Sequence, residues 1–146
     1  MNKIRPLASI FVDSSVILRL ILGEKAFYAD LEKADQVYIS EILKVECYRN
    51  IDRLRLTEAQ WNDQQTALRL NILQDILVKT EEIPLNKKIL QRASESFPTA
   101  IKTLDAIHLA SAIQLREHLK KPFLFITHDR QQSIAAMACG FETAGI

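Results

Sequence analysis

The chain has 146 residues and a formal net charge of +1, with 48% hydrophobic and 25% charged residues. This balance is ordinary for a globular protein, and the length predicts a single domain over residues 1–146. The near-neutral charge excludes a chain that is basic throughout, so any surface that attracts nucleic acid has to be a local patch.

The cysteines and the apolar runs predict a cytoplasmic protein. Cys47 and Cys139 lie far apart and form no CxxC pair, which is typical of reduced thiols. The N-terminal run ASIFVDSSVILRLIL resembles a signal peptide faintly, but Asp13 and Arg19 interrupt it and no small-residue cleavage site follows. Uninterrupted apolar stretches stay far below the roughly 20 residues of a membrane span, so we expect no membrane association.

The first half of the chain alternates short apolar runs with helical periodicity. It predicts strands at residues 9–12 and 36–40, and helices at residues 15–22, 24–34, 41–55 and 57–73. Gly23 ends the first of these helices. The last helix is expected to open at Thr57 and to turn Trp61, Leu68 and Ile72 inward.

The second half continues the alternation. It predicts a strand within residues 76–83, a strand at residues 123–127 and a last short strand within residues 141–146. It predicts helices at residues 86–97, 103–119 and 129–140, of which the first is short and the second long. Pro84 ends the first of these strands, and Thr103 is a candidate N-cap of the long helix. Strands that are almost wholly apolar are typical of sheets covered on both faces, so the pattern predicts an α/β sandwich with a mainly parallel sheet.

Acidic residues follow two of the predicted strands. Asp13 comes directly after SIFV, and Asp129 follows FLFIT by one residue. In an open parallel sheet, ligands bind beyond the carboxyl ends of the strands. If these strands are neighbours, two carboxylates about 5 Å apart repel by roughly 3 kcal/mol at an effective dielectric near 20, and a cation offsets that cost.

Two further acids can join this edge. Asp105 lies in the first turn of the helix TLDAIHLASAI, and Glu46 lies about one turn into the helix after QVYIS. Four carboxylates without a His or Cys cluster predict a site for Mg²⁺ or Mn²⁺. Each acid also has a plain structural reading: Asp13 as a turn residue, Glu46 as a surface acid, Asp105 as a partner of the helix dipole and Asp129 as an N-cap.

Four segments occur in an order and at a spacing that resemble a known family: FVDSSVILRLIL, SEILKVECYRN, KTLDAIHLASA and FITHDRQQSIAAMACGF. They resemble the PIN-domain ribonucleases, specifically the VapC-type toxins of prokaryotic toxin–antitoxin pairs. The resemblance implies a PIN-like three-layer sandwich with about five parallel strands between helices. It also implies metal-dependent cleavage of RNA that leaves a 5′ phosphate, a VapB-type antitoxin that fills the active-site groove, and a homodimer.

The resemblance carries the family's acids onto Asp13, Glu46, Asp105 and Asp129, with Thr127 beside the last. Family members often have Thr after the first acid, where this chain keeps a hydroxyl as Ser14. Our hypothesis is that Asp13 and Asp105 bind the metal directly and that Asp129 binds it directly or through water. Glu46 would orient or deprotonate the attacking water, and Thr127 and Ser14 would tune these groups by hydrogen bonds.

The basic residues offer weaker signals. Glu46, Arg49 and Arg53 follow helical spacing and are expected to share a face, with Arg55 nearby, that leads RNA toward the acids. Lys102 and Arg130 flank two site acids and are further candidates for RNA contact. The alternative for the arginines is an ordinary solvated helix face.

His108, His128 and Cys47 are three further residues near the predicted acids. His108, three residues after Asp105, is expected to be a packed and hydrogen-bonded histidine. His128 either approaches the substrate or is an exposed turn residue. Cys47 is expected to pack in the core without a nucleophilic role, since no local His or Lys activates it.

Other classes of protein fit the sequence less well. A haloacid-dehalogenase-like phosphatase needs a second Asp two residues after the first, where this chain has Ser15. A receiver domain needs an acidic pair and a mid-chain phospho-acceptor Asp, and neither is visible. The main alternative is a catalytically silent PIN-like module that binds RNA or an antitoxin, and the presence of all four acids argues against it.

Overall fold

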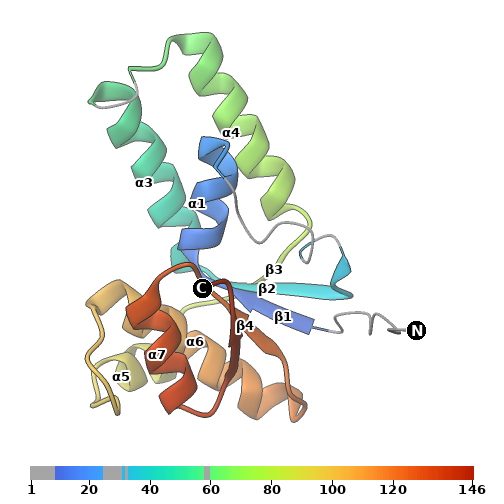
Figure 1. The fold of residues 1–146 in the computed structure, drawn as a ribbon, viewed down its shortest axis with the longest axis vertical. Coiled ribbons are helices and arrows are strands. Elements are labelled where there is room, and N and C mark those ends of the chain that lie inside the picture. Colours follow the sequence, from blue (N-terminus) through green and yellow to red (C-terminus); the bar gives the residue numbers. More distant parts are fainter. Residues whose placement is uncertain (1–8, 25–30, 32, 58–59) are drawn as a thin grey trace.

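The computed structural model describes residues 9–24, 31, 33–57 and 60–146. Within them, five parallel strands form one sheet in the order β3-β2-β1-β4-β5 (Figure 1). The strands are β1 (Ser9–Val12), β2 (Gln36–Ser40), β3 (Glu81–Ile83), β4 (Leu124–Ile126) and β5 (Glu142–Ala144). The predicted α/β class and parallel sheet are confirmed, and β1 and β4 are neighbours, so Asp13 and Asp129 follow adjacent strands.

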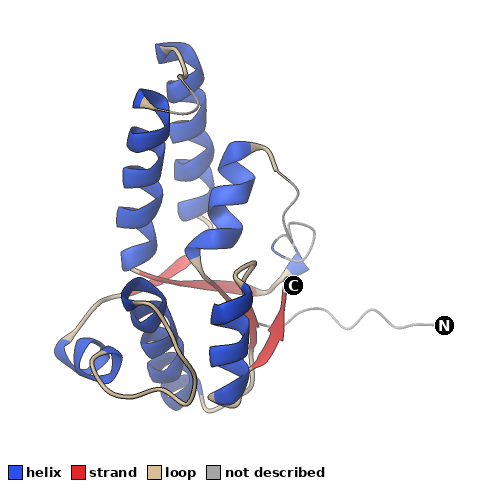
Figure 2. Cartoon of the chain, turned by 60° about the vertical axis from the view of Figure 1, so that its left-hand side comes forward, coloured by secondary structure: helices blue, strands red, loops and turns tan. Residues whose placement is uncertain are grey.

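Helices cover both faces of the sheet (Figure 2). One layer contains α1 (Ser14–Leu22), α3 (Ile42–Leu56) and α4 (Asp63–Leu77), and the other contains α5 (Lys87–Ala93), α6 (Thr103–Leu119) and α7 (Arg130–Ala138). The strand β1 supplies both cores because successive side chains point to opposite faces. Ile10 and Val12 pack in the first layer, while Phe11 packs in the second, where its ring stacks on that of Phe125.

The helix expected over residues 24–34 falls mostly outside the described residues. The prediction that the helix now labelled α4 begins at Thr57 was wrong. Thr57 is the C-cap of α3, and α4 begins at Asp63, where Asn62 and Gln65 form a reciprocal capping box. That box satisfies the N–H groups of Asn62 and Gln65, whereas the Thr57 hydroxyl donates to the Arg53 carbonyl at the end of α3. Leu68, expected to face inward, is 55% exposed.

The helix α6 has the predicted bounds but a different cap. Lys102, in extended conformation, is the N-cap, and its carbonyl accepts the N–H of Ala106 at 2.8 Å. Thr103 is therefore the first helical residue, and the prediction that it caps the helix was wrong. Asp105 still lies in the first turn, as expected.

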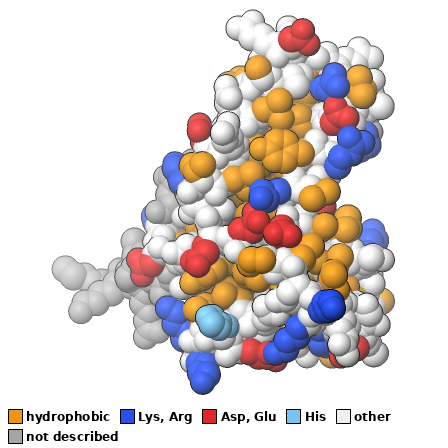
Figure 3. Space-filling view, turned by 180° about the vertical axis from the view of Figure 1, so that it is seen from behind, with side chains coloured by type: hydrophobic (Ala, Val, Ile, Leu, Met, Phe, Trp, Pro, Cys, Tyr) orange, Lys and Arg blue, Asp and Glu red, His pale blue; other side chains and the backbone are white. Residues whose placement is uncertain are grey.

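The surface carries charges of both signs. On the face turned away from the viewer in Figure 1, Lys and Arg side chains are separated by acidic and hydrophobic ones (Figure 3). In the described part of the chain, every helix is too short or too polar to cross a membrane.

Candidate functional site

A groove of about 500 Å³ lies where β1 and β4 end. All four acids predicted from the sequence line it, together with Ser14 and Lys102: Asp13, Glu46, Asp105 and Asp129. They come from four separate segments, namely the ends of β1 and β4, the second turn of α3 and the first turn of α6. The parallel topology brings these segments to one edge of the sheet.

Asp13 is the most deeply buried of the four acids, with 2% of its surface exposed. It is the N-cap of α1: Oδ1 accepts the Ser15 N–H at 3.1 Å and the Ser15 hydroxyl at 2.5 Å. Oδ2 accepts the Thr127 hydroxyl at 2.6 Å. Burial raises the pKa of Asp13, and His108 and these hydrogen bonds oppose the rise only in part. The site thus holds a carboxyl group whose charge is poorly solvated and would be stabilised by a cation.

Asp105 is half-buried at the start of α6. Its pKa is raised to about 6, first by burial and then by the negative charges of Asp129 and Asp13. This mutual effect means that the acids are close enough to repel one another. A bound cation would favour the ionised form of Asp105.

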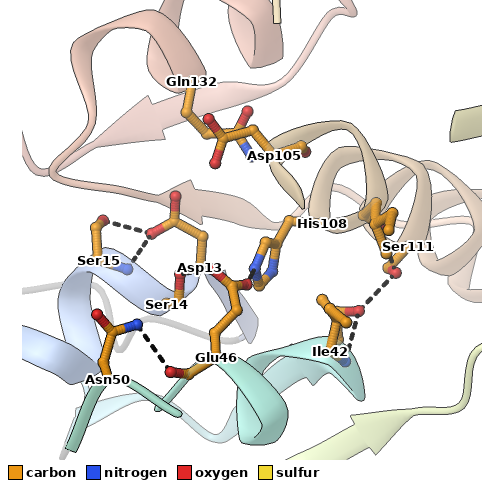
Figure 4. Close-up of polar contacts among 12 residues, drawn as sticks. Asp13, Ser14, Ser15, Ile42, Glu46, Asn50, Asp105, His108, Ser111 and Gln132 are labelled. Atoms are coloured by element: carbon orange, nitrogen blue, oxygen red, sulfur yellow. Dashed lines mark hydrogen bonds and ion pairs between the residues drawn. The ribbon is translucent and has the colours of Figure 1, made fainter. Parts of the chain in front are cut away.

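Glu46 has a hydrogen-bond partner on each carboxylate oxygen. Oε2 accepts the Ser14 hydroxyl at 3.0 Å, and Oε1 contacts Nε2 of His108. Figure 4 shows the His108 ring, from α6, turned toward Glu46 on α3. His108 is fully buried, so the expectation of a packed, hydrogen-bonded histidine is met, and its partner is a site acid.

Asp129 is the N-cap of α7, since Oδ1 accepts the N–H of Gln132 at 2.9 Å. Asp129 is therefore an N-cap, as its structural alternative predicts, and it lines the groove as well. Thr127 is fully buried beside it and accepts the Asp129 N–H at 3.0 Å while its hydroxyl donates to Asp13. One threonine thus links the acids at the ends of β1 and β4.

Of the four predicted RNA contacts, Lys102 alone lines the groove among the described residues. Arg49 and Arg53 line a separate hollow on α3. Arg49 also pairs with Asp52 at 3.1 Å, and Asp52 pairs with Arg55 at 2.8 Å. Arg130 lies in a third hollow, against β5. The predicted arginine stripe is therefore partly neutralised and lines a different hollow from the acids.

Two site residues escaped the sequence reasoning. Ser15 donates its hydroxyl to Asp13 and accepts the His128 N–H at 2.9 Å. Its position two residues after an N-cap acid was an available signal. Gly145 has a φ of +107°, and a Cβ placed there would lie 2.3 Å from the Thr127 carbonyl oxygen. Only the fold reveals that approach.

His128 is half-buried and hydrogen-bonded, so it is not the exposed turn residue of the alternative, whereas Cys47 is packed in the core as expected. His128 Nδ1 donates to the Gly145 carbonyl at 2.7 Å, and His128 is not among the residues that line the groove. Burial, together with the charges of Glu46 and Asp13, raises the pKa of Cys47 to about 12. The thiolate is therefore scarce at neutral pH, which agrees with a packing role.

The acids fit a hard divalent cation in chemistry and charge. Carboxylate and hydroxyl oxygens are the ligands that Mg²⁺ and Mn²⁺ prefer, and the raised pKa values of Asp13 and Asp105 reflect burial of acidic groups. The spacing is open, however: within the described residues, no three His, Cys, Asp or Glu side chains are arranged to hold an ion.

Comparison with known proteins agrees with this architecture. The chain is 25% identical over 142 residues to Ribonuclease VapC47 of Mycobacterium tuberculosis (strain CDC 1551 / Oshkosh), which covers 92% of this chain and 95% of that protein. The fold of the present chain is similar to that of a chain in the crystal structure of VapBC2 from Rickettsia felis bound to a DNA fragment from their promoter. The TM-score is 0.65 at 13% identity, over 93% of the present chain and 97% of the VapBC2 chain.

The crystal structure of PAE2754 from Pyrobaculum aerophilum is also similar, with a TM-score of 0.61 at 16% identity over 94% of this chain and 84% of that one. The model of the PIN domain family matches residues 10–137, which is most of the sequence. The chain therefore belongs to the PIN domain family.

Proposed function

We propose that the protein is a VapC-type ribonuclease toxin that hydrolyses RNA with the help of Mg²⁺ or Mn²⁺. The observation that carries the proposal is the groove in which four acids from separate segments of a PIN-family chain meet. The similarity to Ribonuclease VapC47 of Mycobacterium tuberculosis supports ribonuclease activity. PIN-domain nucleases generally use divalent metal ions, which supports the choice of cofactor.

In the proposed reaction, Asp13 and Asp105 would hold the ion, and Asp129 would hold it directly or through water. When bound, the ion neutralises the phosphate as negative charge builds on it. Glu46 orients the attacking water and accepts its proton. Attack of the water oxygen at phosphorus breaks the bond to the 3′ oxygen, which takes a proton from solvent and leaves as a 3′ hydroxyl, while the other fragment keeps the 5′ phosphate. Ser14 and Thr127 keep Glu46 and Asp13 in place through their hydroxyl groups.

The proposed partners are an RNA substrate, a VapB-type antitoxin that occupies the groove, and a second copy of the chain in a homodimer, all in the cytoplasm. The similarity to a chain of a VapBC2 complex supports the antitoxin. Lys102, on the rim of the groove, is the proposed first contact for the phosphate backbone, with Arg49, Arg53 and Arg130 as more distant ones.

The test is cleavage of total cellular RNA by the purified protein with Mg²⁺, with Mn²⁺ and with EDTA. We expect cuts that need the ion and that are lost in Asp13→Asn and in Asp105→Asn. Asp75→Asn is the matched control, since Asp75 is an exposed acid on α4 that does not line the groove. Mapping the 5′ ends of the products would identify the RNA target.

A catalytically silent PIN-like module that binds RNA or an antitoxin is the second candidate. Absence of cleavage by antitoxin-free, metal-loaded protein, together with retention of RNA or antitoxin peptide by the same sample, would replace the ribonuclease proposal with this one.

A further inference from the structure

The orientation of Glu46 is fixed from two sides. Ser14, at the start of α1, donates to Oε2, while His108, one turn after Asp105 on α6, meets Oε1. A free glutamate side chain samples several rotamers, and two partners on different elements restrict it to one. Only 13% of the Glu46 side chain is exposed, so its remaining contact with water is through the groove.

The chemistry of the contact assigns the proton on His108. An ionised carboxylate only accepts hydrogen bonds, so Nε2 is the nitrogen that carries hydrogen. The other nitrogen, Nδ1, is buried and has no hydrogen-bond partner among the described residues. Among the described residues, the His108 ring therefore makes one hydrogen bond, which is the bond to Glu46.

We propose that His108 is a positioning residue for catalysis, which holds the Glu46 carboxylate, together with Ser14, in the orientation that acts on water. This inference rests on the proposed ribonuclease function and extends it to a residue outside the four acids. One acceptor site of each Glu46 oxygen is occupied by the protein, which leaves one lone pair on each oxygen. Glu46 faces the groove with its remaining lone pairs, which suits a group that orients water.

A packing role alone does not account for His108. Ser111, one turn further along α6, already ties this helix to β2, since its hydroxyl donates to the Ser40 hydroxyl at 2.9 Å. Both residues are fully buried. Ser111 meets a strand residue, whereas His108 meets an acid of the groove. The two residues thus form a matched pair in which only one contacts the candidate site.

The first experiment compares three variants in steady-state RNA cleavage. His108→Leu keeps a side chain of similar size but removes the donor, so kcat should fall about 10- to 100-fold while KM for RNA stays the same. His108→Gln carries an amide N–H near the position of Nε2 and should restore most of kcat. Ser111→Ala should leave kcat unchanged. Equal kcat in His108→Leu and wild type, or no recovery in His108→Gln, would overturn the proposal.

The second experiment needs neither metal nor catalysis. In EDTA, the imidazole nitrogen resonances of His108 should show hydrogen on Nε2, and Glu46→Ala should shift them, whereas Ser111→Ala should not. Hydrogen on Nδ1, or no response to Glu46→Ala, would refute the inference even if His108→Leu did not fold. An inactive wild type with the expected resonances would refute the ribonuclease function and leave the contact intact.

Discussion

The hydroxyl of Thr127 donates to Oδ2 of Asp13 across 2.6 Å, and this bond joins the ends of two neighbouring parallel strands. The same hydroxyl oxygen accepts the N–H of Asp129. Thr127 is fully buried, so no solvent replaces either bond if the hydroxyl is removed. The relative position of two site acids thus depends on one side chain.

Thr127→Val, which keeps the shape but removes the hydroxyl, should lower the free energy of unfolding by about 2 kcal/mol, because the buried carboxyl group of Asp13 and the part-buried N–H of Asp129 both lose a partner. It should also reduce RNA cleavage. Urea unfolding in EDTA measures the first effect. Thr127→Ser keeps the hydroxyl and should lose less stability; equal losses in the two variants would mean that the methyl group is what matters.

Gly145→Ala should destabilise the protein more than Gly23→Ala does. Both glycines have positive φ, +107° and +74°, so both substitutions introduce backbone strain of about 1 kcal/mol. At Gly145 the new Cβ also meets the Thr127 carbonyl oxygen, whereas at Gly23 nothing lies within 4 Å. The difference between the two melting temperatures reports the close approach. Similar losses would show that β5 shifts freely away from Thr127.

Asp105→Asn should change how stability depends on pH. The pKa of Asp105 is raised from 3.8 to about 6 in the folded, metal-free protein, so the folded state binds this proton more tightly than the unfolded state. The resulting stabilisation is complete below pH 3.8 and is lost as the pH rises through about 6. In EDTA, the melting temperature of the variant relative to wild type should therefore rise across this window and then level off. A gap that is constant with pH would contradict the raised pKa.

Asp13→Asn should leave the metal-free melting temperature equal or higher, because it removes a poorly solvated carboxyl group but keeps an acceptor for the N–H of Ser15. Asp13→Ala, without that acceptor, should lose about 1 kcal/mol or more. Mn²⁺ should raise the melting temperature of wild type more than that of Asp13→Asn. Unfolding of metal-free Asp13→Asn would show that Asp13 is a structural residue.

Lys102→Ala should raise KM for RNA more than Arg49→Ala does, since Lys102 lines the acid groove whereas Arg49 pairs with Asp52 on α3. Both variants lose one positive charge, so Arg49→Ala is the control for net charge. Titration of KM against salt should give a shallower slope for Lys102→Ala. Equal effects would mean that RNA crosses the α3 surface as well.

The sequence was a good guide to the strands and to the acids at their ends. Runs such as Ser9–Val12 are apolar at every position because the sheet has helices on both faces, and this property is local. The prediction that Asp13 and Asp129 meet needed only two neighbouring parallel strands. Asp52 as partner of Arg49 and Arg55 was also within reach, since it lies three residues from each.

Helix boundaries, and contacts between residues far apart in the chain, were harder to predict from the sequence. Thr57 and Asn62 are both good N-cap residues, and only the reciprocal bond from Gln65 decides for Asn62. The contact of His108 with Glu46 joins residues 62 positions apart, and it depends on how α6 packs beside α3. No periodicity in the sequence encodes that distance, and the same is true of Gly145 and Thr127.

The strand order has a consequence for the synthesis of the protein. The central strand β1 is made first, but its neighbour β4 and the outer strand β5 are made last. A chain still on the ribosome therefore contains Asp13, Glu46 and Asp105 long before it contains Thr127, Asp129 and the strand that packs against them. The nascent polypeptide thus carries three of the four acids before the fourth, so the groove can form only after β4 and Asp129 have been synthesised.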